Sequence, residues 1–187
     1  MWAVTSAESQ CWVVDASVAF GWFVEVPASA RAVALLEAEP PCDLIAPDLV
    51  LVELLNAGWK ALRLGAITDA QFAAIAELAP MLFRELVPFA PLLIAAQRWC
   101  RQLDHPAYDC LYLALAEQRS AVLLTQDQRL LRKVESVPEA AGLVRPLELG
   151  SSGVPGVNYV GGLSALLPLP WQGEATSKTE PTTGQQG

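Results

Sequence analysis

Four acidic residues fall where an alternating strand and helix chain could gather their carboxylates. Asp15 ends one apolar run, and Asp127 follows a second apolar run much later in the chain. Each run predicts a buried strand, so both carboxylates should lie at the carboxyl edge of a sheet, where open α/β proteins bind their ligands. Glu53 and Asp109 fall in segments that we expect to be helical. Together the four positions predict a strongly negative pocket.

Carboxylates this crowded cannot all stay ionised without a counter-charge, because each raises the pKa of its neighbours. A bound cation resolves the conflict, and oxygen ligands with neither histidine nor cysteine among them select Mg²⁺ or Mn²⁺ over zinc. Such ions activate water and polarise phosphoryl oxygens, so the pattern predicts phosphodiester hydrolysis. Ser17 and Thr125 are close enough in sequence to Asp15 and Asp127 to hold carboxylates or waters in place.

Each acid also has a simpler structural explanation. Asp15 and Asp127 could be turn or cap residues after strands, and Asp109 could only stabilise a first helical turn. Glu53 could be solvated, but its apolar neighbours should leave little exposed helix, so we favour a site; Asn56, three residues on, shares its face.

Two further groups of residues remain open. The only histidine, His105, stands beside Pro106, and we expect it to neighbour a helix cap rather than to act as a general base. Arg129, Arg132 and Lys133 follow Asp127 on a short predicted helix. These basic residues could contact the phosphates of a substrate or form a solvated charged face.

The segments between the acids alternate between strand and helix patterns. Pro47 suits the first turn of a long helix that Gly65 ends, which would put Glu53 about two turns in, and Thr68 with Gln71 forms a capping-box pattern. Such alternation favours a parallel sheet flanked by helices, with right-handed crossovers. We expect strands at 11–14, 44–46, 86–89 and 121–125 and helices at 28–38, 47–64, 68–78, 91–103 and 106–118.

Composition favours one globular domain followed by a tail. The chain has 187 residues, of which 53% are apolar and 17% charged. Its net charge of -8 argues against a general nucleic-acid coat but not against a nuclease, whose acids a metal would match. We expect no membrane span, no secretory signal and a cytoplasmic location. Four cysteines show no metal-site spacing and are expected to be buried free thiols: Cys11, Cys42, Cys100 and Cys110.

The chain from Val13 to about Val134 resembles a PIN-domain ribonuclease, and within that group the VapC-type toxin of a VapBC toxin–antitoxin system. Four segments carry the resemblance, in the family's order: 13–18 (VVDASV), 52–56 (VELLN), 108–117 (YDCLYLALAE) and 123–130 (LLTQDQRL). It implies a PIN-like α/β fold with a central parallel sheet of four to five strands flanked by helices. We place this nuclease domain at 11–149.

The resemblance also implies an activity and partners. The activity would be metal-dependent endoribonuclease cleavage of RNA with Mg²⁺ or Mn²⁺, in a homodimer inhibited by a VapB-like antitoxin. The implied metal ligands are Asp15, Glu53, Asp109 and Asp127, supported by Asn56, Ser17 and Thr125. Residues 150–187 depart from the family pattern as a C-terminal extension, and their Gly, Ser, Pro and Thr content predicts disorder in the last part.

Two other classes of function are compatible with part of the pattern. One is a non-catalytic PIN-like module that binds a partner protein, which the acidic balance and the extension favour. The other is a phosphotransfer receiver domain, which also gathers acids at the edge of a parallel sheet. A receiver should carry a hydroxyl residue and then a lysine on strands after its phospho-acceptor, and the sequence shows no such series.

Overall fold

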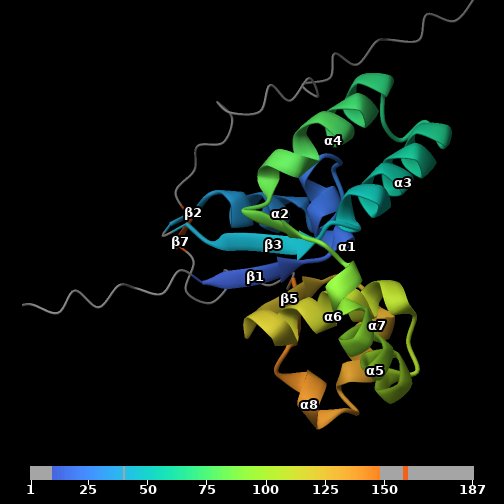
Figure 1. The fold of residues 1–187 in the computed structure, drawn as a ribbon. Helices are drawn as coiled ribbons and strands as arrows, with labels where there is room; N and C mark the ends of the chain where they lie inside the picture. Colours follow the sequence, from blue (N-terminus) through green and yellow to red (C-terminus); the bar gives the residue numbers. More distant parts are fainter. Residues whose placement is uncertain (1–9, 40, 148–157, 160–187) are drawn as a thin grey trace, which may run out of the picture.

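Five parallel strands form the central sheet of the protein, as a computed structural model that describes residues 10–39, 41–147 and 158–159 shows (Figure 1). The spatial order is β4-β3-β1-β5-β6, and every neighbouring pair is parallel. The predicted α/β fold with a central parallel sheet is therefore confirmed. The strands are β1 (Cys11–Val14), β3 (Asp43–Pro47), β4 (Glu85–Val87), β5 (Val122–Thr125) and β6 (Val144–Pro146).

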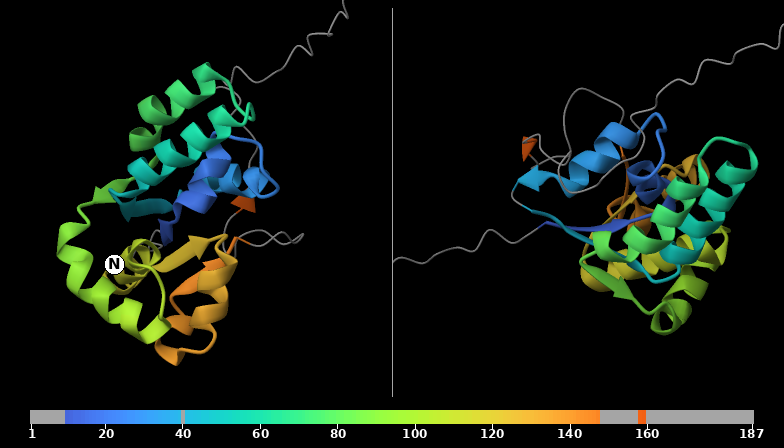
Figure 2. Two further views of the ribbon diagram at one scale, coloured as in Figure 1. Left: turned by 90° about the vertical axis from the view of Figure 1, so that its right-hand side faces the viewer. Right: turned by 90° about the horizontal axis from the view of Figure 1, so that it is seen from above.

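Helices cover both faces of this sheet. Figure 1 shows α1 to α4 above the sheet and α5 to α8 below it, and Figure 2 shows the same two layers from other sides. The first group comprises α1 (Ala16–Ala19), the 3₁₀ turn η1 (Phe20–Trp22), α2 (Ser29–Leu36), α3 (Val50–Arg63) and α4 (Asp69–Leu82). After the 3₁₀ turn η2 (Ala90–Leu92), the second group comprises α5 (Leu93–Leu103), α6 (Ala107–Arg119), α7 (Gln128–Val134) and α8 (Pro138–Ala141).

The direction of the connections reverses between β1 and β5. The chain leaves β1 through α1 and α2 toward β3, whereas it leaves β5 through α7 and α8 toward β6 on the opposite side. Strands β1 and β5 are hydrogen-bonded neighbours, with Val14 opposite Leu124. Such a reversal opens a crevice at the carboxyl ends of the two strands, and open α/β sheets bind ligands there.

Helix α6 is the centre of the lower layer. Its residues 110–116 are all buried, and it packs against β1, β3 and β5 as well as α5. The run of leucine and alanine suits a helix with neighbours on every side. This confirms the burial that the sequence predicts, and it fixes the first turn of α6 beneath the crevice.

Helix α3 begins later than the sequence predicts. Pro47 is the last residue of β3, paired with Val87, and the helix starts at Val50. A proline has no N–H to donate, so it suits a strand end as well as a helix start. Glu53 therefore lies in the first turn of α3, not about two turns in. Gly65, with φ 68°, follows the end of the helix in the left-handed conformation, as expected.

The other element boundaries shift by a few residues. The capping box of α4 is confirmed, since Gln71 N donates to Thr68 Oγ1 at 3.2 Å and Thr68 N donates to Gln71 Oε1 at 2.9 Å. The helix continues to Leu82, beyond the predicted end at 78, with Pro80 inside its last turn. Helix α2 ends at Leu36, before β2 (Ala38–Glu39), which pairs antiparallel with β7 (Asn158–Tyr159).

Other predictions concern burial and the extension. The four cysteines are free, but only Cys110 is buried and the other three are half-buried. Apart from Asn158 and Tyr159, the predicted extension at 150–187 lies outside the described residues. Among the helices that the structure describes, none is long and apolar enough to span a bilayer.

Candidate functional site

Asp15 follows the last residue of β1, at the carboxyl edge of the sheet beside β5. Its side chain accepts hydrogen bonds at Oδ2 from Ser17 Oγ at 2.7 Å and from Thr125 Oγ1 at 2.5 Å. Asp15 is only 8% exposed, and burial raises the pKa of its carboxyl, although the Thr125 and Ser17 hydrogen bonds oppose that rise. The hydroxyls that the sequence assigned to a supporting role therefore hold this carboxylate.

Asp127 follows β5 and caps the next helix. Its Oδ1 accepts from the backbone N–H of Arg129 at 2.6 Å and of Leu130 at 3.2 Å, so the cap interpretation is correct for this acid. Its own N–H donates to Thr125 Oγ1 at 3.0 Å. The Thr125 hydroxyl thus joins Asp15 to the backbone of Asp127, and Asp127 contributes to the raised pKa of Asp15.

Glu53 enters the site from the first turn of α3, where it meets Tyr112 of α6. The Tyr112 hydroxyl donates a hydrogen bond to Glu53 Oε2. The pKa of Glu53 is raised to about 7, mainly by burial and also by the charges of Asp15 and Asp109, while the Tyr112 hydrogen bond opposes the rise. The pKa of Tyr112 is also raised well above its ordinary value by burial and then by Asp15 and Glu53.

Asp109 enters from the first turn of α6, where it meets His105. His105 Nε2 lies 2.7 Å from Asp109 Oδ2. Burial and then the Asp15 charge raise the pKa of Asp109, while His105 lowers it. One ligand atom each from His105, Asp109 and Asp127 lies within 4.8 Å of the others, which is close enough for a shared cation. His105 therefore lies beside the N-cap residue Pro106, as the sequence predicts, and its ring also contacts one of the four acids.

In each of the four acids, the hydrogen-bond donors described above bond one carboxylate oxygen. Side-chain donors reach Oδ2 of Asp15, Oε2 of Glu53 and Oδ2 of Asp109, and backbone donors reach Oδ1 of Asp127. In the described part of the chain, no side-chain donor bonds the second oxygen of any of the four. Second oxygens left in this way are suited to ligate a metal ion, while the donors fix the orientation of each carboxylate.

The charge of the site also fits a cation. Apart from His105, no basic side chain among the described residues forms an ion pair with Asp15, Glu53, Asp109 or Asp127. Burial, and after it the charges of the neighbouring carboxylates, raise the pKa values of Asp15, Glu53 and Asp109. Carboxylate oxygens are hard donors, so the site could hold a divalent cation.

The remaining predicted residues lie at the margin. Asn56 is exposed on α3 and makes no hydrogen bond with the four acids among the described residues. Arg129 and Arg132 are exposed on α7, whereas Lys133 Nζ pairs with Asp104 Oδ2 at 3.2 Å. The prediction that Glu53 has little exposed helix around it is wrong, because Val52 and Leu55 beside it are 64% and 41% exposed.

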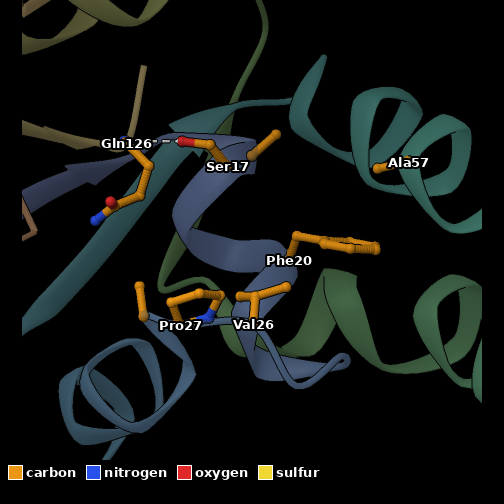
Figure 3. Close-up of a pocket in the computed structure, with 8 residues that line it drawn as sticks. Ser17, Phe20, Val26, Pro27, Ala57 and Gln126 are labelled. Carbon is orange, nitrogen blue, oxygen red and sulfur yellow. Dashed lines mark hydrogen bonds between the residues drawn. The ribbon is translucent and has the colours of Figure 1, made fainter. Parts of the chain in front are cut away.

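A cavity of about 370 Å³ opens beside the Ser17 hydroxyl, which donates a hydrogen bond to Asp15 (Figure 3). Gln126 N donates to Ser17 Oγ at 3.0 Å, so the cavity wall is joined to the residues that hold Asp15. Figure 3 shows the Phe20 ring and Ala57 on the side opposite Gln126. The lining is mostly apolar: Ala16, Ser17, Phe20, Val26, Pro27, Ala28, Ala57 and Gln126.

Two residues of the site were missed from the sequence. Tyr112 follows Asp109 by three residues on α6, and His105 precedes Asp109 by four residues. Helical spacing could have placed Tyr112 on the same face as Asp109, although not its contact with Glu53 on another helix. His105 lies before the helix begins, so helical spacing alone gives no signal for its contact.

Comparisons with known proteins agree with this fold. The family model described as PIN domain matches residues 12–136. A solved structure titled PAE2754, from Pyrobaculum aerophilum, aligns with a TM-score of 0.57 at 24% identity, covering 75% of this chain and 92% of that chain. Another, FitAcB from Neisseria gonorrhoeae, aligns with a TM-score of 0.49 at 18% identity, covering 74% and 97%. No curated protein matches the sequence significantly.

Proposed function

The chain belongs to the PIN domain family, whose members are generally metal-dependent nucleases, and we propose that this protein is a metal-dependent endoribonuclease that hydrolyses phosphodiester bonds in RNA. One observation carries the proposal. Four carboxylates converge where the strand connections reverse, with no lysine or arginine paired to them among the described residues. A negative crevice of this kind repels a phosphodiester unless a cation is bound there.

In this proposal the metal ligands are Asp15, Glu53, Asp109 and Asp127, and the ion is Mg²⁺ or Mn²⁺. When bound, such an ion activates water, polarises the phosphoryl oxygens and stabilises the leaving oxygen. The protein's own groups orient the carboxylates: Ser17 and Thr125 hold Asp15, and Tyr112 holds Glu53.

Substrate contacts would come from the margin of the crevice. Asn56 lies one turn beyond Glu53 on the exposed surface of α3, where its amide could bond a phosphate oxygen or a water. Arg129 and Arg132 are exposed on α7 and are suited to bind more distant phosphates. Lys133 is less suited, because its ammonium group already pairs with Asp104. These contacts are sequence-independent and would position the RNA without reading it.

An RNA substrate is supported by the cavity beside Ser17. Unpaired bases can leave a single strand and stack on an aromatic side chain, and protein recognition of RNA usually targets such bases. The cavity offers the Phe20 ring and apolar walls next to the hydroxyl that holds Asp15. A base next to the scissile phosphate could therefore enter it, which favours cleavage in single-stranded segments.

We further propose that the protein acts in the cytoplasm as the VapC-type toxin of a toxin–antitoxin pair. It would form a homodimer, and a VapB-like antitoxin would inhibit it by placing an arginine or lysine among the four carboxylates, replacing the metal charge. Light scattering of the purified protein tests the dimer. Mn²⁺ titration of the complex with the antitoxin tests whether a basic side chain replaces the metal. A metal affinity equal to that of the free protein would contradict this.

A non-catalytic PIN-like module that binds a partner protein is the second candidate. One observation favours it: Val52, Leu55 and Trp59 expose an apolar stripe along α3 at helical spacing. A stripe of this kind is also compatible with a nuclease that has a partner. Calorimetry decides between them, because a binding module need not bind Mg²⁺ or Mn²⁺ at millimolar concentration.

The decisive experiment is cleavage of total cellular RNA by the purified protein in Mg²⁺ or Mn²⁺. EDTA and the Asp15→Asn variant serve as controls, since Asn retains the shape and the hydrogen-bond acceptor but removes the charge. Discrete fragments that need both the metal and Asp15 are expected. A folded protein that is free of inhibitor and cleaves no RNA would favour the binding module.

A further inference from the structure

His105 is the only histidine of the chain, and its ring is buried at the edge of the candidate metal centre. The side chain is 1% exposed, and Nε2 lies 2.7 Å from Asp109 Oδ2. An ionised carboxylate can only accept, so Nε2–H is the donor. The other ring nitrogen, Nδ1, is buried and has no hydrogen-bond partner among the described residues. The imidazole therefore has a single polar contact, and that contact is with a candidate metal ligand.

The backbone holds His105 on both sides. Asp104 ends α5 in the left-handed conformation, with φ 47°. His105 N donates to the Cys100 carbonyl at 3.3 Å, and the His105 carbonyl accepts from Cys110 Sγ at 3.7 Å. Pro106 follows, with φ fixed near -57°. These contacts leave the ring little freedom, so the chain has fixed the donor before any ligand binds.

The helix cap explains why Asp109 meets this ring. An acid at the third position of a helix commonly reaches back to the backbone N–H of the N-cap residue. Asp109 occupies that position in α6, but the N-cap is Pro106, which has no N–H. The imidazole of the residue before the cap supplies the missing donor. The segment His105-Pro106 thus diverts Asp109 from a capping role to a side-chain contact.

We propose that His105 is a positioning residue of the metal centre: its Nε2–H occupies Asp109 Oδ2 and leaves Oδ1 to ligate the metal ion. The inference rests on the proposed metal-dependent function. Tyr112 at Glu53 and the hydroxyls at Asp15 show the same division between a hydrogen-bonded oxygen and a second oxygen. Groups of this kind commonly contribute a factor of about 10–100 to metal affinity.

The test is Mn²⁺ affinity, measured from the loss of the free-ion electron paramagnetic resonance signal. His105→Leu removes the donor and should weaken binding about 10–100-fold. His105→Gln places an amide N–H near the position of Nε2 and should recover most of the affinity. The matched control is Asp104→Asn, because Asp104 is the adjacent residue, is 97% exposed and, within the described part of the chain, forms an ion pair with Lys133 alone. Its affinity should equal that of the wild type.

Pulsed electron paramagnetic resonance of the Mn²⁺-loaded wild type tells whether His105 positions Asp109 or binds the ion itself. Positioning predicts no ¹⁴N coupling from an imidazole bound to the ion, and a coupling that His105→Gln abolishes would overturn the proposal. If the leucine variant fails to fold, His105→Asn replaces it, since the shorter Asn amide should not reach Asp109 and should bind more weakly than Gln.

Two other results would overturn the inference in distinguishable ways. Equal Mn²⁺ affinity of the wild type and His105→Leu would remove the role of His105 and leave the metal centre intact. A wild type that binds no Mn²⁺ would overturn the proposed function, and the role of His105 with it.

Discussion

Helices α3 and α6 both carry a site acid in their first turn, yet the rest of each helix lies in a different environment. In α6, which carries Asp109, the residues 110–116 are all buried against the sheet and α5. In α3, which carries Glu53, an apolar stripe stays exposed, with Val52 at 64% and Trp59 at 46%. The position of an acid in the crevice therefore depends on where its helix begins, not on how deeply that helix is buried.

The two helices are also joined through the site. The Tyr112 hydroxyl of α6 bonds Glu53 of α3, so the buried helix orients the acid of the exposed one. Asp109 is instead held by His105, the second residue before the start of its own helix. If this division is correct, substitutions of the two acids should lower RNA cleavage equally, whereas substitutions at helix positions that do not contact an acid should leave cleavage unchanged.

The largest expected effect is on cleavage. Asp109→Asn and Glu53→Gln should each lower the rate by roughly a thousandfold, about 4 kcal/mol in activation free energy, because either change removes a metal ligand. Glu77→Gln, on the exposed surface of α4, is the matched control and should cleave normally. Rates on one RNA at saturating Mg²⁺ measure the effect. Full activity of Asp109→Asn would show that the two helices do not contribute equivalent ligands.

Substitutions in the bodies of α6 and α3 should differ in their effect on the stability of the fold. Leu113→Ala empties a fully buried position of α6 and should cost about 3 kcal/mol of the free energy of unfolding. Leu55→Ala, on α3 at 41% exposure, should cost less than about 1 kcal/mol. Urea unfolding of both variants measures the two costs. Similar values would mean that the α3 stripe is covered in solution, for example by a second copy of the chain.

Tyr112→Phe tests how much the hydrogen bond between α6 and α3 contributes to metal binding when all four acids are still present. The ring remains buried and only the hydroxyl that bonds Glu53 is lost, so Mn²⁺ affinity should fall about tenfold with the fold intact. Calorimetric titration measures it. The opposite outcome, an unchanged affinity, would mean that α3 orients Glu53 without help from α6.

The smallest expected effect is a pH-dependent stabilisation. Burial raises the pKa of Glu53 from 4.5 to about 7, so the folded protein binds this proton more tightly than the unfolded chain. Without metal, Glu53 should therefore lower stability as pH rises from about 4.5 to about 7. Glu53→Gln should raise the stability of the metal-free protein at pH 8 by roughly 1 kcal/mol after solvent screening, and change little at pH 4.

Thermal unfolding in EDTA at both pH values checks this prediction, with a shift of about 2–4 °C expected at pH 8. Added Mn²⁺ should reverse the order, because only the wild type retains the ligand. A variant that is less stable than the wild type at pH 8 without metal would contradict the raised pKa of Glu53.

Local patterns were sufficient to predict much of the fold and the positions of two acids. Asp15 directly follows a short apolar run and Asp127 comes two residues after the end of β5, and a strand that is buried on both faces gives that pattern whatever surrounds it. Buried helix α6 was equally visible, because leucine and alanine occupy its whole circumference. Strand β6 was not predicted, since it has three residues and two of them are exposed.

The remaining errors needed information from distant parts of the chain. Pro47 suits a helix start and a strand end alike, and only its pairing with Val87 decides between them. Burial around Glu53 was overestimated because apolar residues of α3 face outward. The bond from Tyr112 to Glu53 spans 59 residues, and the contact of His105 depends on the cap at Pro106, so neither follows from local spacing.

The central claim is that the carboxylates of Asp15, Glu53, Asp109 and Asp127 form one binding site for a divalent metal ion. The most direct measurement is anomalous diffraction from a crystal soaked in Mn²⁺. We expect a peak at the carboxyl ends of β1 and β5, about 2.0–2.4 Å from oxygens of Asp15 and Asp109, with Glu53 and Asp127 bound directly or through water. His105 should remain on Asp109 Oδ2. A peak elsewhere, or none at saturating Mn²⁺, would contradict the account.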